Sequence, residues 1–289
     1  MARSQHSRLD EVLIRPTEDH DPQRAAVLCS EVTRRALRDF APALVFLTPR
    51  DRRRLQAVAA FGLTLFDFAR QSSLEGERLA QINRWRFDLE LTLEGEPPGQ
   101  PVFVLLAATD EEPSWPREAL DRLVGCASRR AVQQRLGSAE AVDRQARQLA
   151  EVLSAALAPE ADRAAAHLVA ALLRVRRLVD LGEDRRRHQA GLGTDELPES
   201  WQAQGPLSAG ELTDVIRLEC DRLDAALEAT QGLASLPKPW RRALTYGVLG
   251  ARRLVARARD AGADVLEAPP TLGALERLGL LLRSRLSPF

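Results

Sequence analysis

The chain has 289 residues, of which 45% are hydrophobic, so it is long enough for one large domain or two smaller ones with a substantial core. Its 41 basic and 41 acidic residues leave no net charge. This balance argues against nucleic acid as the main partner, because nucleic-acid-binding domains usually carry a basic excess.

The three cysteines, Cys29, Cys126 and Cys220, are odd in number and far apart in the sequence. They form neither a metal-binding motif nor a disulfide framework, which favours a reducing compartment. The N-terminal stretch MARSQHSRLDEV lacks the apolar segment of a signal peptide, and no apolar run approaches the ~18 residues that a spanning helix needs. We therefore expect a cytoplasmic protein, with peripheral contact at the inner face of the membrane as an alternative.

Almost every segment has the composition and periodicity of a helix. Ala, Leu, Arg and Glu dominate while Val and Ile are sparse, which favours helix over strand. In chain order, the pattern predicts helices over 20–40, 48–71, 75–95, 101–111, 159–184, 207–230, 238–262 and 271–286, and further helices that begin near Pro116 and Ser138. Three helix-starting signals support this reading: Asp21 before Pro22, Thr48 before Pro49, and Ser208 three residues before Glu211.

The linkers between these helices are short, near 95–100, 109–116 and 189–207. We therefore predict a flexible N-terminal segment over 1–20 and one all-α domain over 21–289. The last helix, LGALERLGLLLRSRL, is apolar enough to lie on a bilayer, but we expect it to pack into the core instead.

An acidic cluster ends the helix predicted over 159–184. Asp180, Glu183 and Asp184 lie three and four residues apart, and side chains at that spacing share one face of a helix. Their oxygens can point at one centre, as Mg²⁺ requires, with waters and phosphate oxygens as the remaining ligands. The arginines that follow in EDRRR favour another interpretation, a solvated helix end stabilised by salt bridges. Spacing alone leaves both open.

The same segment, LVDLGEDRRRHQAGLGTDEL, resembles the second aspartate-rich motif of the squalene/phytoene synthase family, NILRDVGEDxRRGRIYLPxExL. The residues in register are Asp180, Gly182, Glu183, Asp184, Arg186, Arg187, Leu192, Glu196 and Leu197. The stretch EGEPPGQPVFVLLAAT is similar to the family's GxPxxPV sequence, and ADVL to its C-terminal DVL signature. The resemblance extends over residues 25 to 285.

The resemblance implies an all-α isoprenoid-synthase fold around a central cavity, in which Mg²⁺ holds the diphosphate that leaves when two prenyl diphosphates are joined head to head. We expect the candidate catalytic residues Asp67, Asp180 and Asp184 to face that cavity, with Arg70 on its opposite wall. The other candidates are the metal ligands Asp180, Glu183 and Asp184, the diphosphate-binding residues Arg70, Arg186 and Arg187, and the cavity-lining residues Phe40, Phe61 and Phe66.

The first aspartate-rich motif of the family, DDxxD, is degraded in this sequence. In register the chain reads FDFAR over 66–70, which keeps one acid, Asp67, and ends on a cation, Arg70. A motif arginine corresponds to Leu63, a motif tyrosine corresponds to Gly191, and the chain has a single tyrosine, Tyr246. A wall that carries about three carboxylates in the family has roughly no net charge here, so a weakened Mg²⁺ site is expected.

Three functions remain open. The chain can be a non-catalytic relative whose cavity is empty or binds a prenyl lipid, or a divergent enzyme in which Arg70 contacts a phosphate in place of a metal ion. It can also be a subunit that works beside an active paralogue. Arg70 has a structural interpretation as well, an ion pair with Asp67 or with the acids of the second motif. We expect weak or absent Mg²⁺-dependent turnover of farnesyl or geranylgeranyl diphosphate, with ordinary squalene or phytoene synthesis as the alternative.

Overall fold

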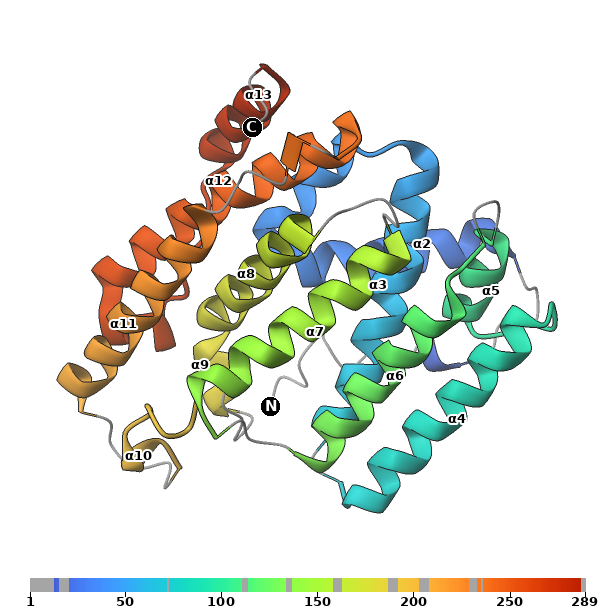
Figure 1. Cartoon of the computed structure of the whole chain (residues 1–289), viewed down its shortest axis with the longest axis horizontal. Coiled ribbons are helices and arrows are strands. Elements are labelled where there is room, and N and C mark those ends of the chain that lie inside the picture. Colours follow the sequence, from blue (N-terminus) through green and yellow to red (C-terminus); the bar gives the residue numbers. More distant parts are fainter. Residues whose placement is uncertain are drawn as a thin grey trace, which may run out of the picture. The chain divides into compact units, whose positions relative to one another are not determined.

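The computed structural model describes residues 13–15, 21–71, 73–110, 114–133, 137–157, 163–186, 192–202, 208–228, 233–234 and 236–286. Within these ranges the regular structure is helical and contains no strand, so the predicted all-α fold class is confirmed (Figure 1). The segment predicted to be flexible, 1–20, falls almost wholly outside the described residues. No helix in the described part of the chain is long and apolar enough to cross a membrane.

The contacts of the chain group into two compact units. The first unit holds the helices up to residue 134, apart from residues 42–46, together with 155–159. The second holds residues 42–46, 135–154 and everything from 160 onward. Each unit is described by itself below, and the single domain predicted over 21–289 stays a prediction.

The first unit is built around a short helix that is buried on nearly every side. Its elements are α2 (Pro22–Leu37), residues 38–41 of the 3₁₀ segment η1 (Arg38–Phe46), α3 (Pro49–Arg70), α4 (Glu75–Leu93), α5 (Pro101–Ala108) and α6 (Arg117–Val132). α5 packs against α2, α3 and α4, and α6 covers α3 and α4. Phe103 of α5 lies 6.1 Å from the ring of Phe61 and 4.6 Å from that of Trp85, which gives this core its aromatic centre.

The second unit consists of two long helices with shorter ones packed around them. Its elements are α7 (Ala139–Leu157, up to residue 154), α8 (Arg163–Val179), α9 (Leu181–Arg186), α10 (Glu199–Gln202), α11 (Ala209–Glu228), α12 (Lys238–Ala261), the 3₁₀ segment η3 (Gly262–Leu266) and α13 (Ala274–Leu286). α8 packs against both α11 and α12, and α13 packs on α12 (Figure 1). Small side chains, Ala146 and Ala150 of α7 and Ala170 of α8, form a further buried cluster.

The helix-starting signals read from the sequence are present. The Asp21 carboxylate accepts a hydrogen bond from the Gln23 amide at 2.9 Å, and the Thr48 hydroxyl accepts one from the Asp51 amide at 3.1 Å. The Ser208 hydroxyl accepts a longer one from the Glu211 amide, at 3.4 Å. These side chains satisfy amide groups that have no partner inside the first turn of a helix.

Cys29, Cys126 and Cys220 are free and buried. Burial raises the pKa of Cys29 and of Cys220 to about 12, and it raises the pKa of Cys126 as well. The thiolate is the reactive and metal-binding form of cysteine, so these side chains act as small core residues at neutral pH.

The packing expected for the last helix is only half right. α13 does pack on α12, and Ser284 is fully buried. Four of its six leucines, however, are exposed: Leu275, Leu278, Leu282 and Leu286. Periodicity predicted the helix correctly but could not say which of its faces meets α12.

Gly182 allows α9 to lie directly on the backbone of η3. A Cβ atom built at this position would lie 2.1 Å from the carbonyl oxygen of Leu266 and 2.9 Å from its carbonyl carbon. Any side chain here must therefore displace backbone, which cannot move as a flexible side chain can.

We expect Gly182→Ala to lower the free energy of unfolding by about 1–3 kcal/mol or more, because the added methyl group overpacks the contact between α9 and η3. Gly210→Ala in α11 is the matched control, since nothing lies within 4 Å of its Cβ position. It should be neutral or stabilise by up to about 1 kcal/mol. Urea denaturation followed by circular dichroism measures both. Equal stability of the two variants would contradict the close approach.

Candidate functional site

The last turns of α3 carry the positions that correspond to the degraded aspartate motif. Phe68 and Ala69 are buried, with exposed fractions of 5% and 1%, and Phe68 packs edge-on against Trp85. Phe66, Asp67 and Arg70 are only partly buried. With 3.6 residues per turn, the three positions that are acidic in the family pattern thus share the less buried face of α3, while the two between them point into the core. The three positions keep the spacing of the family motif, but Asp67 is the only acid among them, and the other two hold Phe66 and Arg70.

The acids of the second motif lie where α8 runs into α9. Helical hydrogen bonds continue through the junction, from the Asp180 amide to the Arg176 carbonyl at 3.0 Å and from the Asp184 amide to the Asp180 carbonyl at 2.9 Å. The three carboxylates therefore keep the spacing that the sequence predicted.

These carboxylates do not converge on a common centre. Asp180 Oδ2 lies 2.9 Å from Arg176 Nε, Glu183 Oε2 lies 2.7 Å from Arg186 Nη2, and Asp184 is 6% exposed. Among the described residues, no group of three His, Cys, Asp or Glu side chains is placed to hold a metal ion. Two of the three carboxylates are engaged by an arginine one turn away, and the metal site predicted at Asp180, Glu183 and Asp184 stays a prediction. The salt-bridged helix end is the interpretation that the structure supports.

The arginines proposed to bind diphosphate have different surroundings. Arg186 is 65% exposed at its side chain and is bonded to Glu183, whereas Arg187 lies outside the described residues. Arg70 is partly buried at the end of α3 and has interactions of its own. Its predicted ion pair with Asp67, and its predicted contact with a phosphate, stay predictions.

The three phenylalanines expected to line a cavity also differ. Phe40 in η1 and Phe66 in α3 are partly buried, while Phe61 has no exposed surface and packs on Phe103. Asp67 belongs to the first unit, and Asp180 and Asp184 belong to the second. The prediction that these residues face one cavity therefore stays a prediction.

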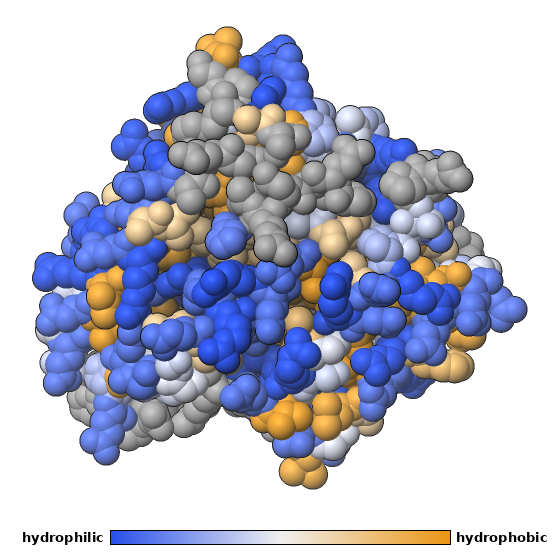
Figure 2. All heavy atoms as spheres, viewed as in Figure 1, coloured by the Kyte–Doolittle hydropathy of each residue, from blue (hydrophilic) through white to orange (hydrophobic). Residues whose placement is uncertain are grey.

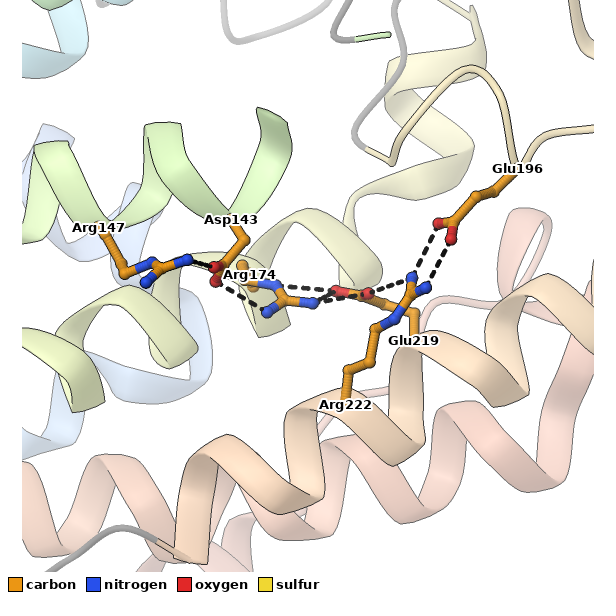
Figure 3. A network of polar contacts seen from close by, with 6 residues as sticks. All are labelled: Asp143, Arg147, Arg174, Glu196, Glu219 and Arg222. Carbon is orange, nitrogen blue, oxygen red and sulfur yellow. Dashed lines mark hydrogen bonds and ion pairs between the residues drawn. The ribbon is translucent and has the colours of Figure 1, made fainter. Parts of the chain in front are cut away.

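A chain of ion pairs with a buried centre in the second unit was not anticipated from the sequence (Figure 3). Arg174 Nη2 of α8 donates to both carboxylate oxygens of Glu219 of α11 at 2.8 Å, and its Nη1 donates to Asp143 of α7 at 3.1 Å. The exposed fractions of Arg174 and Glu219 are only 7% and 4%. Their separation of 45 positions in the chain leaves no local pattern by which to find the pair.

The network continues from Glu219 to the loop that precedes α10. Arg222 Nη1 lies 3.8 Å from Glu219, and its two terminal nitrogens donate to Glu196 at 2.6 and 2.9 Å. The bond to Glu196 raises the pKa of Arg222. Asp143 pairs in addition with Arg147 (Figure 3). Three acids and three arginines thus balance, and Glu196, which stands in register with the family motif, serves to hold its own loop against α11.

Comparison with known proteins agrees with this reading of the fold. The family model described as squalene/phytoene synthase matches residues 33–276. No protein of curated function matches the sequence.

Solved structures of similar fold include a dehydrosqualene synthase in complex with a ligand, with a TM-score of 0.73, 16% identity, and coverage of 92% of this chain and 98% of that one. The squalene synthase HpnC from Alicyclobacillus acidocaldarius has a TM-score of 0.62 and 20% identity, and the match covers 83% of this chain and 95% of that one. YisP from Bacillus subtilis has a TM-score of 0.66 and 14% identity, with coverage of 98% and 100%. At these identities the likeness is one of fold, and the fold is of the isoprenoid-synthase type.

We expect Arg174→Leu to lower the free energy of unfolding by about 3 kcal/mol, because it leaves the Glu219 carboxylate buried with only Arg222 nearby. Arg35→Leu is the control: its partner Glu31 is about half exposed, so the loss should stay below about 1 kcal/mol. The double variant Arg174→Leu/Glu219→Leu should recover much of the stability, since no uncompensated charge remains. Urea denaturation measures all three, and equal costs for the two single variants would show that the pair is not structural.

Proposed function

The chain belongs to the squalene/phytoene synthase family, and from this we propose that it is a divergent member that binds a prenyl diphosphate or a prenyl lipid without ordinary magnesium-dependent squalene or phytoene synthesis. Two of the relatives named above are synthases by their descriptions. This chain keeps only one of the three acids of the family's first motif, Asp67.

The observation that carries the proposal is the composition of the α3 face. Phe66, Asp67 and Arg70 share that face in the register of the family's three acids. A Mg²⁺ ion that bridges protein and diphosphate needs carboxylate oxygens around it, and a guanidinium repels it. One carboxylate one turn from an arginine has about no net charge, so this face lacks the donors for the ion.

The junction of α8 and α9 adds a second argument. Two of its three acids are engaged by arginines, Asp180 by Arg176 and Glu183 by Arg186. A metal ion would have to displace a charge-assisted hydrogen bond from each of these carboxylates before it could bind. As it stands, this donor set does not fit Mg²⁺.

What the chain keeps is a supply of cations near both motifs. An arginine can bind a phosphate through two parallel hydrogen bonds without any metal. Arg70, on the face where the family has an acid, is the residue we propose for that contact. Binding of a prenyl diphosphate would then be independent of Mg²⁺.

We expect no squalene or phytoene when the purified protein is incubated with labelled farnesyl or geranylgeranyl diphosphate, with or without Mg²⁺, because too few carboxylates are free to hold the ion. Thin-layer chromatography of the extracted lipids measures the product. Robust Mg²⁺-dependent product would reject the proposal and establish an active synthase. Product formed only in the presence of a co-purifying relative would favour the subunit function instead.

We further expect the double variant Phe66→Asp/Arg70→Asp, which restores the DDxxD pattern, to bind Mg²⁺ at least about tenfold more tightly than the wild type, since it exchanges a cation and a ring for two carboxylates. Isothermal titration with MgCl₂ measures the affinity without reference to activity. The variant Phe66→Asn/Arg70→Asn controls for loss of the ring and the cation alone. Unchanged affinity in a variant with wild-type circular dichroism would contradict the assignment of this face.

A further inference from the structure

The outer face of α13 is an apolar surface that the second unit leaves uncovered. Four leucines make up this leucine stripe, and their exposed fractions lie between 54% and 86%: Leu275, Leu278, Leu282 and Leu286. Hydrophobic spheres stand out among hydrophilic ones near the end of α13 in the upper part of Figure 2. At 3.6 residues per turn these positions form one continuous ridge along the helix.

The opposite face of α13 is anchored, so the stripe cannot turn inward by rotation of the helix. Ser284 is fully buried, and its hydroxyl donates to the Leu280 carbonyl at 2.8 Å. Arg242 of α12 donates to the Arg285 carbonyl at 3.1 Å, and Arg257 of α12 bonds Glu276 at 2.7 Å. The orientation of the leucines is thus set by contacts at both ends of the helix.

Cations border the stripe on both sides. Arg283 and Arg285 are exposed. At 3.6 residues per turn, they lie on opposite sides of the leucine stripe around the helix axis. Glu276 is the single acid of α13, and it is held by Arg257 and by the Gly273 amide. The exposed face therefore combines a leucine ridge with basic edges.

We propose that α13 docks this protein on an anionic lipid surface, with the leucine stripe in the interfacial region and Arg283 and Arg285 at the headgroups. An amphipathic helix that lies in the plane of a bilayer has this arrangement of apolar ridge and cationic border. Each arginine near an anionic surface adds attraction, and an apolar face together with charges supplies the two signals that stable peripheral binding requires.

The charge pattern favours a bilayer over a second copy of the chain. In a two-fold dimer through the stripe with parallel helices, Arg283 and Arg285, both in the last turn of α13, would be brought toward those of the second copy, which opposes association. A bilayer with acidic headgroups offers a continuous apolar region beneath opposite charge. The proposal does not depend on the proposed function, since it needs neither a prenyl ligand nor catalysis.

The test is flotation of the purified full chain with vesicles of phosphatidylcholine that contain phosphatidylglycerol, and with vesicles of phosphatidylcholine alone. We expect flotation only with the anionic vesicles, and less of it at high salt because salt screens the arginines. Leu278→Ser/Leu282→Ser and Arg283→Gln/Arg285→Gln should each weaken binding about tenfold or more.

The control variant is Val27→Ser/Phe87→Ser, which removes two exposed hydrophobic side chains from α2 and α4. It should float like the wild type, and circular dichroism establishes that all variants are folded. Absence of flotation, equal flotation with both kinds of vesicle, or equal loss in the control would overturn the proposal. A dimer in sedimentation velocity that dissociates in Leu278→Ser/Leu282→Ser would also overturn it, and would identify a second copy as the occupant.

Discussion

The ion pair between Arg174 and Glu219 is the contact on which the second unit depends. Both side chains are buried, so each charge must be neutralised by a neighbour, and the bidentate geometry does this while it fixes α8 against α11. Its extensions to Asp143 and, through Arg222, to Glu196 place α7 and the loop before α10 on the same scaffold. Asp143, Glu196 and Glu219 therefore hold helices and a loop together, so fewer carboxylates of this unit can bind a ligand.

The first unit shows a different kind of constraint, in which packing is retained while chemistry changes. Phe68 lies against Trp85, and Ala69 is buried beside it, so α3 must keep its rotation about its own axis. That rotation holds positions 66, 67 and 70 together on the less buried face. These three positions are less buried than Phe68 and Ala69, so an arginine can stand where the family has an acid while the packing of α3 on Trp85 is kept.

Local patterns in the sequence were enough to predict the helices and their starting residues, because capping and periodicity act over a few residues. Short motifs were likewise enough to predict the family. They were not enough for the acids near the end of α8. Spacing establishes that Asp180, Glu183 and Asp184 share a face, but the choice between a shared metal and separate arginines depends on rotamers. Nor could a pattern show that Gly182 touches the backbone of Leu266, or which face of α13 meets α12, since both depend on residues distant in the chain.

The near absence of lysine strengthens the competition between basic side chains and metal ions for the carboxylates of this protein. Lys238 is the only lysine in the sequence, so nearly every basic partner of a carboxylate is an arginine. A guanidinium engages a carboxylate through a rigid fork and loses less freedom per hydrogen bond than an ammonium does. Mg²⁺ must remove such a partner from Asp180 and from Glu183 before it can use their oxygens, and it must also give up tightly held water. Both exchanges oppose binding, so under the proposed function the arginine-rich composition and the degraded motif of α3 would weaken the affinity for metal by separate routes.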